Sequence, residues 1–139
     1  MTAMHNRKIT IIHGVLDNVM EQIRRQLAVP GFNICGEMKI VANDMRYDVI
    51  LVDLPRVSSK IALIASHRSL ILPGCISIME TNPGTCEVSV VNPTEMLAAK
   101  DNNDPVLYLA MEMTTEMERV VQKIETVDGI APDLVTSWE

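Results

Sequence analysis

Apolar residues recur at two different periods along the chain, and the change of period separates predicted strands from predicted helices. Residues 8–14, "KITIIHG", are rich in β-branched side chains and predict a first strand that ends at Gly14. Residues 32–41 predict a second strand, and residues 43–48, "NDMRYD", predict a turn or a short irregular link. Residues 49–54, "VILVDL", are apolar on both parities, which favours a central strand that is covered on its two faces.

Two segments carry apolar residues at steps of three and four, the spacing of one helix face. In residues 16–31 we expect Asp17 or Asn18 to cap the helix and the closing Pro-Gly pair to end it. Residues 55–66 repeat the pattern, and Pro55 suits a first helical turn because its missing donor would be unbonded there anyway. The expected apolar stripes are Leu16, Val19, Met20, Ile23 and Leu27 in the first segment, and Val57, Ile61, Leu63 and Ile64 in the second.

The longest helix is predicted to begin at Pro105, with Asp104 as its cap. Residues 111–117, "MEMTTEM", invite an alternative interpretation as a copper(I) site made of thioethers. Core packing is favoured, because Met113 and Met117 fall on the apolar stripe of the helix and methionine fills irregular gaps. The stripe consists of Val106, Leu109, Ala110, Met113, Met117, Val120, Val121 and Ile124.

Residues 69–93 contain two apolar runs that flank an Asn-Pro-Gly turn, which predicts a β-hairpin with Pro83 and Gly84 at its tip. Counting outward from an ideal turn places Cys75 and Cys86 near opposite ends of the hairpin. The two thiols are then too far apart for a disulfide. The same count places Glu80 opposite Glu87, a pairing that is unfavourable unless the carboxylates are exposed or share a proton or a cation.

The elements follow the order β-α-β-β-α-β-β-α, which predicts an α+β fold with a single, mostly antiparallel sheet and helices packed on one face. We expect residues 1–127 to form one domain and residues 128–139 a C-terminal tail docked through Leu134 or Trp138. Because several strands are apolar on both parities, the second face of the sheet needs a cover as well. An exposed apolar face of this kind typically marks an interface, so the sequence predicts a homodimer.

Composition narrows the classes of function. The net charge is −6 and there is no run of Lys or Arg, which argues against nucleic acid and anionic membrane surfaces as partners. No segment has the length of a signal peptide core or a membrane span, so we expect a cytoplasmic protein. No Walker loop, Gly-x-Ser-x-Gly or His-Glu-x-x-His motif is present, and the sequence favours a protein that is not an enzyme.

The candidate chemistry centres on Cys75, because the spacing of the three cysteines matches no zinc or disulfide framework. Cys75 can be a thiolate nucleophile or metal ligand, or a small buried hydrophobe, and the second interpretation is favoured. His13, His67 and Asp53 would join it if the fold brought them to one end of the sheet. Imidazole and thiolate ligands would then suit copper or zinc.

The stretch "SLILPGCISIMETNPGTCEVSVVNPTEML" resembles the DUF302 family of unknown function. Leu70-Ile71-Leu72-Pro73, Asn92-Pro93 and Met96-Leu97 carry the resemblance, which spans roughly residues 8–125. It implies a fold similar to the α+β sheet of TATA-binding proteins and often a dimer. It does not imply DNA binding, and no activity is established for the family as a whole. The chain departs from the family pattern where Gly74 precedes Cys75, and where Asp53-Leu54-Pro55 replaces Cys-Asn-Pro.

Together these observations predict a non-enzymatic homodimer that binds a small ligand or a protein partner at the sheet or dimer face. The candidate residues are Cys75, His67, His13 and Asp53, and the sequence does not identify a cofactor. The alternative is a thiol-dependent or metal-dependent protein that handles sulfur or redox equivalents through Cys75.

Overall fold

The computed structural model describes residues 7–65, 74–91, 105–124 and 133–136. It confirms the predicted α+β fold and the order β-α-β-β-α-β-β-α, to which one short strand is added at the end. The elements are β1 (Arg7–His13), α1 (Leu16–Ala28), β2 (Asn33–Ala42), β3 (Met45–Asp53), α2 (Pro55–Ala65), β4 (Gly74–Asn82), β5 (Thr85–Val91), α4 (Pro105–Gln122) and β6 (Asp133–Thr136).

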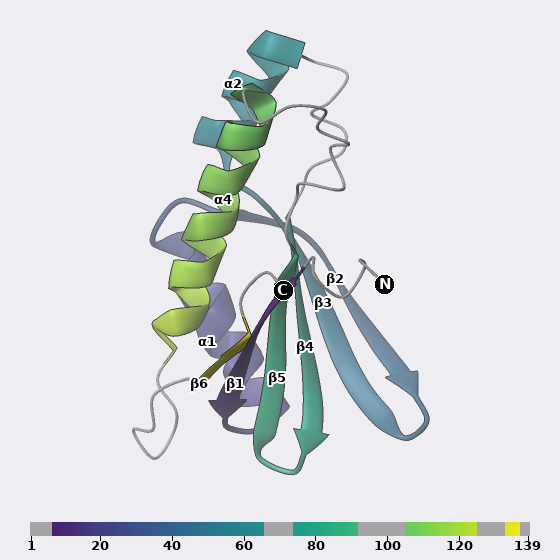
Figure 1. Ribbon diagram of the computed structural model, residues 1–139. Coiled ribbons are helices and arrows are strands. Elements are labelled where there is room, and N and C mark those ends of the chain that lie inside the picture. The colour runs from purple at the N-terminus through teal and green to yellow at the C-terminus, as the bar shows by residue number, and fades with distance from the viewer. Residues whose placement is uncertain (1–6, 66–73, 92–104, 125–132, 137–139) are drawn as a thin grey trace, which may run out of the picture.

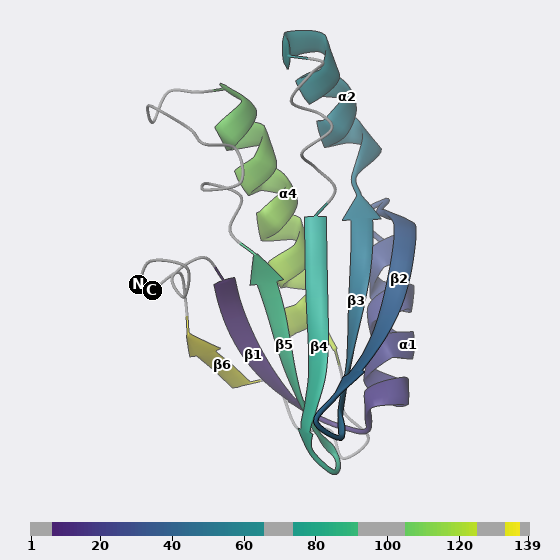
Figure 2. The same cartoon turned by 90° about the vertical axis from the view of Figure 1, so that its right-hand side faces the viewer.

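The strands form one antiparallel sheet with the order β2-β3-β4-β5-β1-β6. The helices α1, α2 and α4 lie on the same side of this sheet, and α2 extends past its upper end (Figure 1). Figure 2 looks onto the opposite side, where the strands stand in front and the helices behind. We call the helix side the covered face and the other side the open face.

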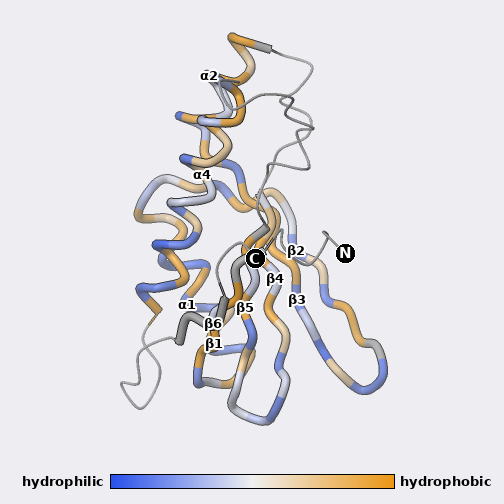
Figure 3. The backbone as a smooth tube through the Cα atoms, viewed as in Figure 1, coloured by the Kyte–Doolittle hydropathy of each residue, from blue (hydrophilic) through white to orange (hydrophobic). Residues whose placement is uncertain are grey.

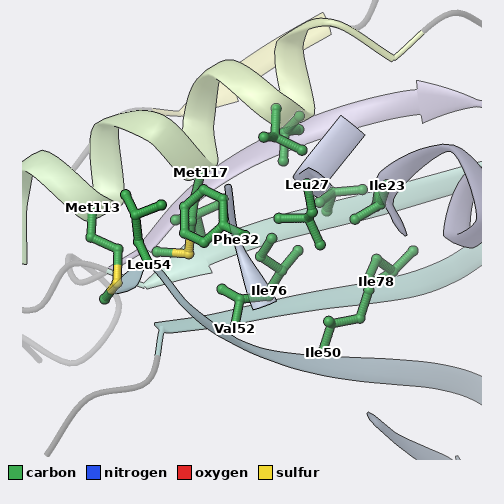
Figure 4. Close-up of a cluster of buried hydrophobic side chains, with 14 of the residues drawn as sticks. Ile23, Leu27, Phe32, Ile50, Val52, Leu54, Ile76, Ile78, Met113 and Met117 are labelled. Atoms are coloured by element: carbon green, nitrogen blue, oxygen red, sulfur yellow. The ribbon is translucent and has the colours of Figure 1, made fainter. Parts of the chain in front are cut away.

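The core lies between the covered face and the helices (Figure 4). Strand β4 shows how the pleat divides the side chains: Ile76 and Ile78 are fully buried, whereas the intervening Ser77 is partly exposed. The first residue of β4 is Gly74, and a Cβ atom there would lie 2.7 Å from the sulfur of Met117. A glycine therefore lets α4 approach the start of the strand. Met113 and Met117 are buried in this core, which agrees with the packing interpretation.

Two helices differ in detail from their prediction. Helix α1 begins after Val15, which forms no side-chain cap, so the expected cap at Asp17 or Asn18 is wrong. In α2 the outer residues Leu63 and Ile64 are 88% and 52% exposed, so the buried stripe of this helix is shorter than predicted. The hydrophobic end of α2 is visible in Figure 3.

The link between β2 and β3 is a two-residue hairpin turn, so the predicted turn is confirmed at residues 43–44, whereas residues 45–48 belong to a strand and not to a link. Asn43 and Asp44 have φ values of 53° and 63°, the left-handed pair that a type I′ turn requires. β3 consequently begins at Met45 and carries Asp48, which is 1% exposed. Arg46 neutralises this buried carboxylate, with Nη2 3.1 Å from Oδ2 of Asp48.

The β4–β5 hairpin has the predicted tip, because Asn82 pairs with Thr85 and Gly84 adopts a φ of 80°. The register shifts between Glu80 and Asn82, a bulge that an ideal turn does not contain. Glu80 therefore lies opposite Cys86, and Met79 lies opposite Glu87. The expected pairing of Glu80 with Glu87 is wrong for this reason.

Strand β6 falls inside the segment expected to be a tail, and the sequence pattern did not predict it. It pairs with β1 at the edge of the sheet, where Thr10 lies opposite Leu134. The proposed docking residue Trp138 and the proposed helix cap Asp104 lie outside the described residues.

Charged side chains join the helices to each other and to the sheet. Arg56 of α2 binds both Glu112 and Glu116 of α4. Arg24 of α1 binds Glu37 of β2 through two hydrogen bonds of 2.7 and 2.8 Å. Among the helices of the described residues, none is long and apolar enough to cross a membrane.

Candidate functional site

The open face presents a shallow hollow at the centre of the sheet. Two adjacent rows of side chains cross β3, β4 and β5 here, because opposite residues of antiparallel strands point to the same face. One row consists of Tyr47, Met79 and Glu87, and the next consists of Val49, Ser77 and Ser89. All of these residues except Val49 line the hollow, which has a volume of about 240 Å³.

The chemistry of the hollow combines one carboxylate with neutral polar and apolar groups. Glu87 is its single charged residue, flanked in its row by Met79 and Ile11. Ser89 is only 4% exposed and forms part of the floor. Glu87 forms no ion pair with the side chains that the structure describes. The site can therefore offer a negative charge, hydroxyl groups, an aromatic ring and a thioether to one small ligand.

Cys75 lies on the open face but not in the hollow. It is the second residue of β4, half-buried, and opposite Leu51 of β3. Burial raises the pKa of its thiol, because a thiolate would lose hydration there. A reactive thiolate needs the opposite shift. The surroundings of Cys75 therefore favour the neutral thiol.

The other predicted site residues do not gather around Cys75 as a group. Asp53 ends β3 near the same end of the sheet, where it lies opposite Asn33. His13 ends β1 and lies opposite Thr85, near the other end. His67 lies outside the described residues.

The separation of His13 from Cys75 follows from the strand directions. β1 and β4 run the same way, since each is antiparallel to β5. Val90 of β5 aligns Lys8 with Ile76, so His13 lies five residues beyond that level and Cys75 one residue before it. At about 3.3 Å per residue, the two are roughly 20 Å apart along the strands. Among the described residues, no three His, Cys, Asp or Glu side chains are placed to hold a metal ion together.

The remaining cysteines occupy contrasting positions. Cys35 is exposed on β2, and Cys86 is fully buried on the covered face. The Cys86 thiol lies 3.4 Å from the carbonyl oxygen of Gly14, to which it donates. Burial, with smaller contributions from the charges of Glu80 and Asp48, raises the pKa of Cys86 to about 12. All three cysteines are free. Cys86 lies opposite Glu80, five residues along β4 from Cys75, so the predicted separation of these two cysteines is confirmed.

A second hollow, of about 250 Å³, lies between the end of α1 and α4. Two of its three charged residues bind each other, and one also binds a neighbouring helix: Glu116 accepts from Arg119 at 2.5 Å and from Arg56 of α2. These contacts explain the charges of Glu116 and Arg119 without a ligand. It is lined by Gln26, Val29, Pro30, Glu116, Arg119, Val120 and Lys123.

The residues of the open-face hollow were not predicted as a site. Ser77, Glu87 and Ser89 alternate with buried aliphatic residues, which is the ordinary pattern of a strand with one solvated face. These residues come together in the hollow only because of the register in which the three strands pair. A signal was present in the hairpin sequence, because these polar residues share one parity on each side of the turn.

In the part of the chain that the structure describes, an open antiparallel sheet with three helices on one face defines the structural class of this protein. The sequence matches the family described as "Domain of unknown function DUF302" over residues 8–124, and the chain belongs to that family. The structure is similar to the crystal structure of an uncharacterized conserved DUF302 protein from Bacillus stearothermophilus. The TM-score is 0.73 at 12% sequence identity, covering 83% of this chain and 94% of that chain. A comparison with curated proteins finds no match.

Proposed function

We propose that this protein is a non-enzymatic homodimer that binds a small ligand at the open-face hollow, in the cytoplasm. The observation that carries the proposal is the single carboxylate of Glu87 among hydroxyl, aromatic and thioether groups on a sheet face that bears no described helix. A cytoplasmic setting fits an exposed free thiol at Cys35, because a reducing compartment preserves it.

The charge of the hollow favours a ligand that carries a positive charge. An organic ammonium group can contact Glu87 while its apolar part lies against Tyr47 and Met79. Tyrosine rings attract cations through their negative faces, which adds to the attraction of the carboxylate. An anionic ligand would meet repulsion from Glu87, and it gains no cationic partner from the residues that line the hollow.

Matched aromatic probes test this proposal. Benzylammonium, benzyl alcohol and benzoate have similar size and differ mainly in charge. Each is titrated into ¹⁵N-labelled protein while backbone amide shifts on β3, β4 and β5 are followed. We expect benzylammonium to bind most tightly, in the millimolar range, and benzoate to bind most weakly. Glu87→Gln should weaken the binding of benzylammonium about two- to fivefold, the effect of one partly exposed ion pair.

Glu80→Gln is the matched control, because this substitution removes the same charge from the same hairpin. Glu80 lies opposite Cys86, so its position in the strand belongs to the covered face and not to the hollow. Its affinity for benzylammonium should equal that of the wild type. If Glu80→Gln and Glu87→Gln behaved alike, or if benzoate bound as well as benzylammonium, the cationic specificity would be wrong. If none of the probes shifted open-face resonances, the small-ligand function would be wrong, and a protein partner would become the better explanation of this face.

The alternative function through Cys75 has a weaker basis. Its thiol lies on the open face, as a sulfur carrier would require, but burial favours its protonated form. Its test is reaction of the native protein with a thiol reagent at neutral pH. Labelling of Cys75 faster than Cys35 would revive the thiol function, whereas slower labelling supports the ligand-binding proposal.

A further inference from the structure

β2 is a long edge strand without a strand partner on its outer side among the described residues. It has ten residues, whereas β6 at the opposite edge has four. An unpaired edge presents a row of backbone donors and acceptors that can template another strand. The side chains of Met38 and Val41 on β2 are also 51% and 73% exposed. This edge therefore offers both backbone pairing and apolar contact to a second strand.

Two-fold symmetry limits how β2 can pair with β2 of a second copy. In an antiparallel pair, residues that lie opposite each other point to the same face of the sheet. An axis perpendicular to the sheet leaves each side chain on its own face, so a residue can pair only with one of the same parity. The axis must then pass beside a single residue, which lies opposite its own counterpart.

Charge selects one of the central registers. An axis at Glu37 would set two carboxylates opposite each other, and an axis at Lys39 would set two ammonium groups opposite each other. An axis at Met38 instead places Glu37 opposite Lys39 of the second copy, and this attractive pair occurs twice. Opposite charges across a strand pair are favourable, and like charges are unfavourable.

The same register suits the neighbouring residues of β2. Met38 lies opposite its own counterpart on the open face, and Ile40 lies opposite Gly36 of the second copy. The large side chain thus faces the smallest one. The register shift between Ile34 and Gly36 marks the start of the regular segment, which spans residues 36–42 and contains all of these pairs. Glu37 is held by Arg24 of α1, so its carboxylate is already oriented at this edge.

We infer that the protein self-associates by antiparallel pairing of β2 with β2 of a second copy, about a two-fold axis at Met38. The two sheets then form one continuous sheet with the described helices of both copies on one side and both open faces on the other. Pairing of this kind is closed, because each copy uses its long edge once and only the four-residue strand β6 remains at the ends. The inference rests on the homodimer in the proposed function and supplies its geometry.

Cysteine cross-linking tests the position of the axis. Met38→Cys is made in a Cys35→Ser background and oxidised mildly. The two cysteines would have Cα atoms about 4.5 or 5.5 Å apart, within the range of a disulfide. We expect most of the protein to form a disulfide-linked dimer on a non-reducing gel. The control is Leu63→Cys in the same background, because residue 63 is 88% exposed on α2 and away from β2, and it should form little dimer.

Charge reversal tests the register. Lys39→Glu would set Glu37 opposite a carboxylate on both sides of the axis, and we expect the dissociation constant of the dimer to rise at least about tenfold. Lys60→Glu makes the same charge change on the exposed surface of α2 and should leave the constant unchanged. A mixture of Lys39→Glu with Glu37→Lys protein should regain association as heterodimers, because both pairs are attractive again.

Sedimentation of the wild type separates the possible failures. A dimer that neither cross-links at position 38 nor responds to Lys39→Glu would overturn the β2 geometry and leave the homodimer intact. A monomer at tens of micromolar would overturn both the β2 geometry and the homodimer. The titration with benzylammonium would still test the ligand site independently. Efficient cross-linking together with the heterodimer rescue would establish the pairing.

Discussion

The two faces of the sheet are built from neighbouring residues of the same strands, yet one face is buried against helices and the other is partly exposed. On the covered face Ile50, Ile76 and Ile78 are fully buried against the helices. On the open face Ser77, which lies between the two isoleucines of β4, and Met79, which follows Ile78, remain partly exposed. One face is a packed interior, and the other is a surface with apolar and polar groups side by side. The difference separates the residues that stabilise the fold from those available for binding.

The largest expected effect compares Ile78 with its neighbour Met79. Ile78→Ala removes a fully buried side chain and should lower the free energy of unfolding by about 3 kcal/mol, from lost burial and the cavity left behind. Met79→Ala removes a partly exposed side chain of similar size and should cost less than about 1 kcal/mol. Urea denaturation of both variants measures the contrast. Equal losses would mean that the open face is buried in solution, as it would be in a face-to-face dimer.

A smaller loss of stability is expected when the cation that pairs with a buried carboxylate on the covered face is removed. Asp48 is 1% exposed and has Arg46 as its cation, which in turn binds Asp17 of α1 at 2.9 Å. Arg46→Gln would remove the ion pair of a buried carboxylate and should cost about 2 kcal/mol, below the range for fully buried pairs because Arg46 is partly exposed.

The matched control for that variant is Arg25→Gln on α1. Arg25 binds Glu21 at 2.5 Å, but both side chains are exposed, so the expected loss is under about 0.5 kcal/mol. Chemical denaturation of both variants at neutral pH provides the comparison. If the two losses were equal, the buried position of Asp48 would have no special energetic role.

The order of the elements was predictable because each has a clear period. The stripe of α4 and the alternation in β4 are long enough to identify a helix and a strand without tertiary information. The start of β3 was not predictable, since residues 45–48 are mostly polar and resemble a loop. Their place in a strand depends on the pairing of Arg46 with Asp48, which converts a buried charge into a satisfied one.

Failures in register had a different cause. One bulge beside Thr81 moves the partner of Glu87 from Glu80 to Met79, and no local pattern in the sequence marks that bulge. The hollow on the open face depends on this register, so the sequence could suggest individual polar residues but not their meeting. β6 was missed because four residues are too few to show a period, and its pairing with β1 is remote in the sequence.

The smallest expected effect concerns the thiols on the two faces. Cys86 has its pKa raised to about 12 in the folded protein, whereas an unfolded cysteine ionises near 8.5. Between these values the unfolded chain has released a proton that the folded chain retains. The unfolded state therefore binds fewer protons, and the stability that Cys86 contributes falls as pH rises. That contribution is complete below about pH 8, and its loss ends only near the folded pKa.

Comparison with Cys86→Ala isolates this effect from the titration of lysines and tyrosines. The stability advantage of the wild type over Cys86→Ala should shrink by about 1 kcal/mol between pH 8 and pH 9.5, measured by urea denaturation. Burial also raises the pKa of Cys75, but by less, so the same comparison with Cys75→Ala should show a smaller change. If Cys75 showed the larger change, its thiol would be the better shielded of the two. The open face would then have a cover at that end of the sheet in solution.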